Sequence, residues 1–160
     1  MIELQYGCEH PDIPAPEAVR RWLEEAAGMA GADGELLVRI VSPEESAELN
    51  GRYRGRNRPT NVLSFPFTAP EGLPAEAMPT QLGDLVICAE VVAEQAREYG
   101  RTPEAHWAHM LVHGLLHLLG HDHQSAEEAA RMEAQESRIM EQLGFDDPWH
   151  GENEGNRHHG

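Results

Sequence analysis

The chain has 160 residues and a formal net charge of −16, and all twelve of its basic residues are arginine. This length suffices for one domain with a proper core. So acidic a balance disfavours diffuse binding to nucleic acid or to anionic membranes. No apolar run reaches the roughly eighteen residues of a membrane span. Two cysteines, Cys8 and Cys88, and no visible export signal predict a reducing, cytoplasmic location.

The first half of the chain predicts strands and short helices in alternation. Ser42 followed by Pro43 is typical of a helix start, because the serine side chain caps the free N–H groups and proline fits the first helical position. In order, we expect a strand over residues 1–6, a helix over 16–29, a strand over 35–41, a short helix from 42 to about Gly51, and a strand over 61–67 that ends or lies at an edge because of Pro66.

The second half predicts more helix than strand. Thr102 with Pro103, and later Ser125 with Glu128, mark two further helix starts. We expect a loop over residues 68–80, a strand over 82–88, and helices over 89–99, 103–119 and from 126 to about 144. The predicted fold class is α+β, with a small mixed sheet of about four strands packed with about five helices. Residues 1–148 form a single domain, and residues 149–160, with His158 and His159, form a disordered tail.

Three histidines near the C-terminal third predict a metal site. His113 and His117 are four residues apart, so on a helix they project from the same face. Gly120 can end that helix and turn the chain, which would bring His123 to the same point. Three neutral imidazoles with an open fourth position form the pattern of a catalytic zinc site. The predicted site therefore lies on a central helix and on the turn after it.

A packing role for these histidines is the alternative, since a single histidine on an apolar helix is usually a core residue. Several imidazoles buried there without partners would be costly, however. A closed structural zinc site usually has four protein ligands, often cysteines, and Cys8 and Cys88 lack suitable spacing. A fourth ligand or a supporting residue would come from His109, one turn before His113, or from His121 and Asp122 in the turn.

A second notable stretch, residues 51–59, holds four of the twelve arginines. If the stretch is extended, alternate arginines share one side. The planar guanidinium group suits phosphate, and Tyr53 is able to stack on a base. The alternative is a solvated loop that pairs with surface carboxylates. Polar side chains follow directly after it, so the candidate substrate contacts are Arg52, Arg54, Arg56, Arg58, Asn61 and Ser64.

Several stretches together are highly specific. They are residues 53–55 (Tyr-Arg-Gly), 59–67 (Pro-Thr-Asn-Val-Leu-Ser-Phe-Pro-Phe), 82–87 (Leu-Gly-Asp-Leu-Val-Ile), 105–110 (Ala-His-Trp-Ala-His-Met) and 120–123 (Gly-His-Asp-His). With them the chain resembles the YbeY family of bacterial endoribonucleases, which act in ribosomal RNA maturation. The resemblance covers nearly the whole chain and is clearest over residues 49–148. The family often has tyrosine where this chain has His121, which leaves the role of that histidine open.

The resemblance implies one zinc ion per chain, held by His113, His117 and His123, and a functional arginine at Arg54. It implies a zinc-dependent endoribonuclease that acts on single-stranded ribosomal RNA, in maturation of the 16S rRNA 3′ end and in ribosome quality control. The small ribosomal subunit or one of its proteins is the expected partner, and no membrane is involved.

Two other functions compete with this one. A metalloprotease or another zinc hydrolase would share the spacing from His117 to His123, but zinc proteases carry a glutamate directly after the first histidine, where this chain has Gly114. The other rival is a non-catalytic ribosome assembly factor in which zinc only braces the fold.

Overall fold

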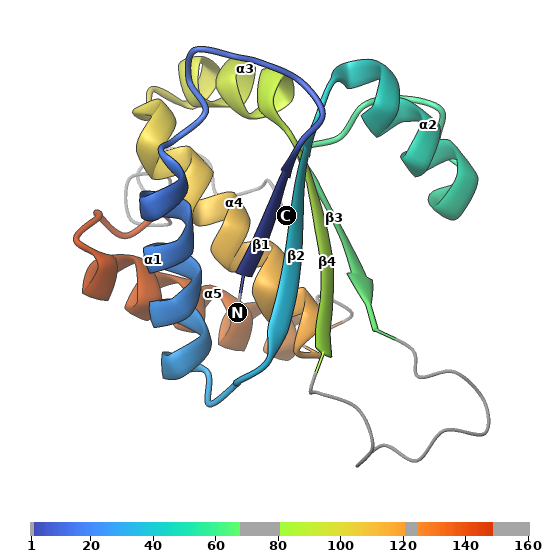
Figure 1. The fold of residues 1–160 in the computed structure, drawn as a ribbon. Coiled ribbons are helices and arrows are strands. Elements are labelled where there is room, and N and C mark those ends of the chain that lie inside the picture. Colours follow the sequence, from blue (N-terminus) through green and yellow to red (C-terminus); the bar gives the residue numbers. More distant parts are fainter. Residues whose placement is uncertain (1, 68–80, 121–124, 149–160) are drawn as a thin grey trace, which may run out of the picture.

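The computed structural model describes residues 2–67, 81–120 and 125–148 (Figure 1). The predicted loop over residues 68–80, the predicted tail over 149–160, and the turn with His121, Asp122 and His123 lie outside the described residues.

A four-stranded mixed sheet organises the fold, with the strands in the order β1-β2-β4-β3. The strands are β1 (Ile2–Tyr6), β2 (Glu35–Val41), β4 (Gln81–Cys88) and β3 (Val62–Pro66). Strand β2 pairs in parallel with both β1 and β4, whereas β3 runs antiparallel to β4, with Ser64 opposite Leu85. Strand β3 is therefore an edge strand, as Pro66 predicted.

Five helices surround the sheet: α1 (Pro16–Met29), α2 (Pro43–Arg54), α3 (Ala89–Tyr99), α4 (Pro103–Leu118) and α5 (Ala126–Leu143). Helices α1, α4 and α5 lie on one side of the sheet, and α2 lies on the other (Figure 1). The α+β class with four strands and five helices is thus confirmed. In the described ranges, no helix combines the length and apolar character that a membrane crossing requires.

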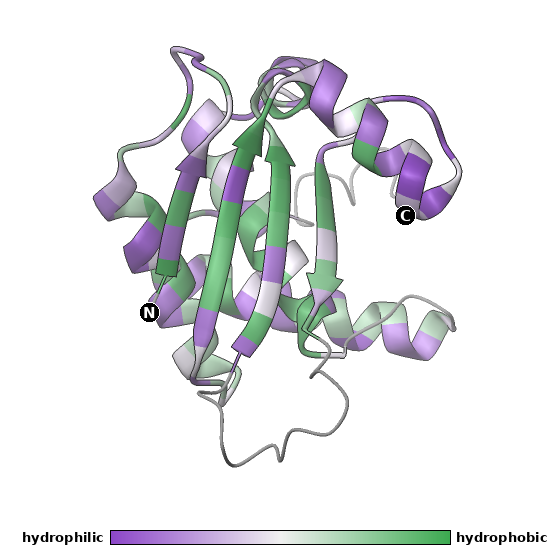
Figure 2. Cartoon of the chain, turned by 45° about the vertical axis from the view of Figure 1, so that its right-hand side comes forward, coloured by the Kyte–Doolittle hydropathy of each residue, from purple (hydrophilic) through white to green (hydrophobic). Residues whose placement is uncertain are grey.

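Helix α4 is the centre of the main core. It contacts α1, α3, α5, β3 and β4, which explains why it is apolar on nearly every side. Trp107, Leu111 and Leu115 are fully buried, and the alternate residues Val38 and Ile40 of β2 point toward the helices. Figure 2 shows how hydrophobic and hydrophilic residues are distributed: hydrophobic residues lie along the central strands, and hydrophilic ones lie on the outer turns of the helices.

A smaller core lies on the other face of the sheet. Val41, Leu63, Val86 and Cys88 form it, with Leu49 of α2 and Phe65 of β3 packed against them. Since side chains alternate along a strand, β3 sends Phe65 to this face and its neighbour Ser64 toward α4. The edge strand is thus the element that separates α2 from α4.

Helix α2 departs from the prediction, because it continues to Arg54 rather than ending near Gly51. Its left-handed cap is Gly55, with φ of 74°. Gly51 serves another purpose: a Cβ there would overlap the side chain of Asn57. Arg52 and Arg54 therefore lie on a helix and, two residues apart, project about 200° from each other. The extended conformation considered for this part of the arginine stretch is wrong.

Gly114 lies where helix α4 approaches the sheet most closely. A Cβ at this position would lie 2.9 Å from Leu85 Cδ2, 3.1 Å from Val62 Cγ2 and 3.3 Å from Ser64 Oγ. The position thus faces the sheet, so a glutamate side chain there would enter the core between α4 and the strands. Close packing between α4 and the sheet therefore explains why this chain has glycine at the position where zinc proteases carry a glutamate.

Two glycine substitutions in helices should have opposite effects on stability. Gly28→Ala in α1 meets nothing within 4 Å, so it should raise the free energy of unfolding by up to about 1 kcal/mol through helix propensity. Gly114→Ala gains the same propensity but presses on the fully buried Leu85, and overpacking costs about 1–3 kcal/mol. We expect a net loss of about 1 kcal/mol in urea denaturation. A stabilised Gly114→Ala protein would contradict the close packing described here.

Candidate functional site: a histidine cluster on helix α4

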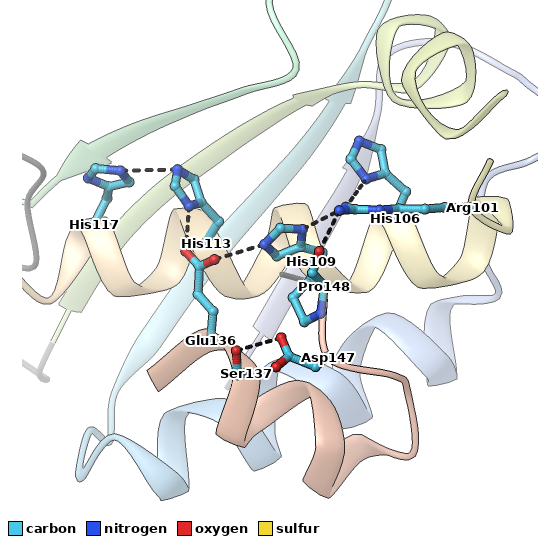
Figure 3. A network of polar contacts seen from close by, with 9 residues as sticks. All are labelled: Arg101, His106, His109, His113, His117, Glu136, Ser137, Asp147 and Pro148. Carbon is cyan, nitrogen blue, oxygen red and sulfur yellow. Dashed lines mark hydrogen bonds and ion pairs between the residues drawn. The ribbon is translucent and has the colours of Figure 1, made fainter. Parts of the chain in front are cut away.

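Helix α4 presents four histidines along one side, at positions 106, 109, 113 and 117 (Figure 3). Thr102 caps the helix by accepting a hydrogen bond from the Ala105 N–H, at 3.1 Å. Steps of three and four residues keep the imidazoles in one row. His106 and His109 are buried, whereas the side chain of His113 is 22% exposed. The row thus runs from the interior toward the surface.

His113 and His117 converge as the sequence predicted. Their Nε2 atoms are 3.2 Å apart and their ring centroids 4.6 Å apart. Two nitrogens bound to one zinc ion at ~2.0–2.1 Å, with a tetrahedral angle, lie about 3.3–3.4 Å from each other. The observed separation therefore suits either a shared proton or a shared metal ion between the two rings.

A buried glutamate, Glu136 of α5, forms hydrogen bonds with two histidines of the row. Its Oε2 atom lies 2.6 Å from His113 Nδ1, and its Oε1 atom lies 2.8 Å from His109 Nε2. Burial by itself would raise the pKa of this carboxyl group, but the hydrogen bonds from His109 and His113 outweigh burial and lower the pKa to about 2. Glu136 is therefore an anion with no exposed surface, beneath the paired imidazoles.

The hydrogen bonds also determine which ring nitrogens carry protons. Arg101 donates to His109 Nδ1 at 3.2 Å, because a guanidinium group has no acceptor. His109 is then a neutral ring whose Nε2–H donates to Glu136, in agreement with a pKa that burial lowers. His113 bonds the same carboxylate through Nδ1, and its Nε2 faces His117. Metal-binding histidines commonly have this orientation, with one ring nitrogen held by a carboxylate and the other directed at the metal ion.

The network continues toward the start of α4. Arg101 also donates to His106 Nδ1 at 3.3 Å and to the carbonyl oxygen of Pro148 at 2.7 Å. His106 Nε2 then donates to Gln95 Oε1 at 3.0 Å. Burial is the main cause that lowers the pKa of His106 to about 3, and the neighbouring His109 and the charge of Arg101 lower it further, so this ring is neutral. The buried imidazoles thus form one connected hydrogen-bonded structure with fixed orientations.

Two of the expected substrate contacts have structural partners. Asn61 donates from Nδ2 to Gln95 at 3.2 Å and accepts from the Val62 N–H at 2.6 Å, which joins it to α3 and to the start of β3. Ser64 donates to the carbonyl oxygen of Gly114 at 3.0 Å. These bonds fix β3 against α3 and α4, beside the histidine row.

The arginines of the predicted substrate-binding stretch do not join the histidine row. Arg52, Arg54, Arg56 and Arg58 are all exposed, at and after the end of α2. Arg52 forms a surface ion pair with Glu48 at 3.0 Å. Since α2 and α4 pack on opposite faces of the sheet, the arginines and the histidines lie on either side of the edge strand β3.

The third expected ligand, His123, and the possible supporting residues His121 and Asp122 lie outside the described residues. Among residues 2–67, 81–120 and 125–148, no group of three His, Cys, Asp or Glu side chains is arranged to hold a metal ion. The two described ligands of the predicted site are brought together, and His109 supports them through Glu136.

Glu136 is the residue of the site that sequence reasoning missed. Its signal was nevertheless present, because α5 has an apolar face with Met132, Ile139, Met140 and Leu143, and Glu136 occupies that same face. A lone carboxylate at a core position requires a charged or hydrogen-bonding partner. The sequence does not indicate which of the four α4 histidines that partner is.

These features define a class of protein: an α+β domain whose central helix carries a pair of imidazoles oriented by a buried carboxylate. A family model described as endoribonuclease YbeY matches residues 9–144. A protein named endoribonuclease YbeY from Halorhodospira halophila is 54% identical over 152 residues, which cover 93% of this chain and 98% of that protein. The chain therefore belongs to the YbeY family of endoribonucleases.

The fold has a counterpart among solved structures. The solution structure of TM1509 from Thermotoga maritima matches with a TM-score of 0.60 and 26% identity, and the match covers 100% of this chain and 97% of that one. The similarity thus extends over both the sheet and the helices that carry the site.

Replacing the buried carboxylate by an amide should disturb the imidazole pair. In Glu136→Gln, the side-chain NH₂ must face an N–H of His109 or of His113, so one ring changes tautomer or loses its partner. An unsatisfied buried donor costs about 1–3 kcal/mol, and we expect that loss in the free energy of unfolding. The control is Glu141→Gln, an exposed change on the same helix, which should stay within about 0.5 kcal/mol of the parent. Equal stability of the two variants would refute the role given to Glu136.

Proposed function

We propose that the protein is a zinc-dependent endoribonuclease that cuts single-stranded ribosomal RNA. The ligands in this proposal are His113, His117 and His123, with one zinc ion per chain. The observation that supports it best is the carboxylate-oriented imidazole pair, whose Nε2 atoms are 3.2 Å apart. When bound, zinc supplies Lewis-acid activation of water, whose pKa falls to about 7.

The residues around the pair fit a cation. Glu136 places a buried negative charge beside the imidazole pair, which favours a positive ion there. Its hydrogen bond to His113 fixes the ring so that Nε2 points outward, an arrangement common to zinc-binding histidines. The partial exposure of His113 leaves the position accessible from solvent.

The roles of the other residues follow from their chemistry. Arg54 contacts the phosphate and stabilises the charge that develops on its oxygens. Arg52, Arg56 and Arg58 contribute further phosphate contacts, and Asn61 and Ser64 hold the edge strand or meet the substrate. The proposed cellular task is maturation of the 16S rRNA 3′ end and ribosome quality control in the cytoplasm, with the small ribosomal subunit as partner.

Two observations weigh against the rival functions. The position that would carry a protease general base, residue 114, faces the sheet and has no room for a side chain. A purely structural zinc site usually has four protein ligands, often cysteines, and the two cysteines, Cys8 and Cys88, belong to the segment after β1 and to strand β4, outside helix α4.

The metal site should depend on His117. We expect one zinc ion per purified chain by elemental analysis, and loss of both zinc and rRNA cleavage in His117→Ala. His10→Ala, a histidine outside the α4 row, should keep both. Retention of zinc by a double His113→Ala/His117→Ala protein would sink the proposed ligand set. Zinc binding with no cleavage of any ribosomal RNA would favour the assembly factor.

Arg54 should be needed for cleavage but not for folding or zinc content. Because it is exposed, Arg54→Ala should retain the melting temperature, while rRNA cleavage falls by about 10²- to 10³-fold, the usual loss for one donor to a developing oxyanion. Arg54→Lys should restore activity only in part, since an ammonium group cannot make the bidentate contact. Arg21→Ala, an exposed arginine of α1, is the matched control. Full activity of Arg54→Ala would contradict the assignment.

The acidity of the protein should make its binding to free RNA weak. A net charge of −16 repels a polyanion over a Debye length of about 8 Å at physiological salt, so only a confined basic surface can dock it. Few phosphates are then neutralised, and we expect a shallow dependence of affinity on salt. Binding should be tighter on the small ribosomal subunit than to the isolated strand. Tight binding of free RNA with a steep salt dependence would refute this picture.

A further inference from the structure

An exposed tyrosine lies within the arginine stretch. Tyr53 of α2 is 60% exposed, the largest value among the large hydrophobic side chains of the described residues. An aromatic ring left in water at the end of a helix loses the stabilisation that burial would provide. One such residue by itself is ordinary for a protein surface. Tyr53 differs from such a residue because it packs on an aromatic ring and lies in a segment rich in arginine.

The ring of Tyr53 is held in a fixed orientation. It meets Phe65 of β3 edge to face, with ring centroids 5.2 Å apart and an interplanar angle of 67°. Phe65 is itself half-buried against the smaller core, next to Leu63 and Val86. Phe67, two residues further along, is 39% exposed. Tyr53 therefore packs against β3 through this contact, which restricts the ring and reduces the conformational entropy lost when a flat molecule stacks on it.

Tyr53 lies within a cluster of arginines along the chain of an otherwise acidic protein. Arg52 and Arg54 flank Tyr53 in sequence, and Arg56 and Arg58 follow after the helix cap. All four side chains are exposed. The ion pair of Arg52 with Glu48 joins side chains that are 59% and 67% exposed, and such surface pairs contribute little, so phosphate can replace the carboxylate. Aromatic rings beside arginines form the usual binding surface for single-stranded nucleic acid.

The edge strand connects this surface to the histidine row. Ser64 hydrogen-bonds the carbonyl oxygen of Gly114, the residue after His113, while its neighbour Phe65 supports Tyr53. Adjacent Cα atoms are about 3.8 Å apart. The aromatic ring and the histidine helix are thus held by consecutive residues of one strand, on its two faces. A chain that crosses this edge would meet both.

We propose that Tyr53 is a stacking platform for one nucleobase of the single-stranded substrate, on the opposite side of β3 from the histidines. This inference rests on the proposed nuclease function and deepens it, because it gives the requirement for a single strand a physical basis. A base in a duplex is already stacked and paired, so it cannot present its face to Tyr53. Every base has an aromatic face, so the platform accepts a base without regard to sequence.

Binding to two strands of equal length tests the proposal. One is a short single-stranded RNA, and the other has the same sugar–phosphate backbone with abasic positions. Affinity is measured by fluorescence anisotropy at low salt. Loss of one stacked base is worth about 1–3 kcal/mol, so Tyr53→Leu should bind the normal strand about 5- to 150-fold more weakly than the parent does. It should bind the abasic strand as the parent does, and its salt dependence should be unchanged.

Three further variants sharpen this comparison. Tyr53→Phe keeps the ring and should bind like the parent. Tyr6→Leu removes another exposed tyrosine at the opposite edge of the sheet and should have no effect. Tyr53→Trp, made together with Trp149→Phe, introduces an exposed reporter, since the other two tryptophans, Trp22 and Trp107, are buried. Its fluorescence should be quenched by the normal strand and much less by the abasic one, which tests the contact even if the leucine variant folds poorly.

The outcomes separate this inference from the nuclease function. A stacking effect at Tyr53 with no cleavage by any variant would keep the platform and remove the nuclease. Cleavage by the parent, together with unchanged binding and no quenching at position 53, would keep the nuclease and overturn the platform. Equal losses of Tyr53→Leu on the normal and abasic strands would also overturn it, because Tyr53 would then only support the fold of the arginine stretch.

Discussion

The bridge that Glu136 forms between His109 and His113 is the interaction on which the site depends. A carboxylate with no exposed surface is tolerated only with strong hydrogen-bond donors, and two imidazole N–H groups supply them. The same two bonds tie α5 to α4 and fix the orientation of both rings. The hydrogen bonds that compensate for burying this anion thus also hold the ring of His113 in one orientation, at the more exposed part of the row.

The edge strand β3 has a comparable role on the other side of the site. Its antiparallel pairing with β4 places it between two helices that never share a face of the sheet. Ser64 contacts the histidine helix and Phe65 contacts the arginine-bearing helix, and Gly114 permits the close approach of α4. Arginines and histidines about sixty positions apart in sequence are thereby held at one edge of one sheet.

The chemistry divides between a buried network and an exposed surface. Within the network, His106, His109 and Glu136 are buried, and this burial keeps the imidazoles of His106 and His109 neutral. The arginines of residues 52–58 are instead solvated, so their contribution to binding is screened by salt and confined to close range. The overall charge of −16 repels polyanions, so the arginine stretch is a local exception to the field of the whole protein.

The sequence alone determined the fold class, nearly all the elements and the pair His113 and His117, because helix caps, apolar periodicity and a four-residue spacing are local properties. Only the tertiary structure identified Glu136, since nothing in the sequence shows that position 136 on α5 lies against positions 109 and 113 on α4. It likewise decided that Arg52 and Arg54 are helical, because Gly51 accommodates Asn57 and the left-handed cap falls at Gly55. Contacts between residues distant in the chain depend on how the elements pack, and local patterns carry no record of that packing.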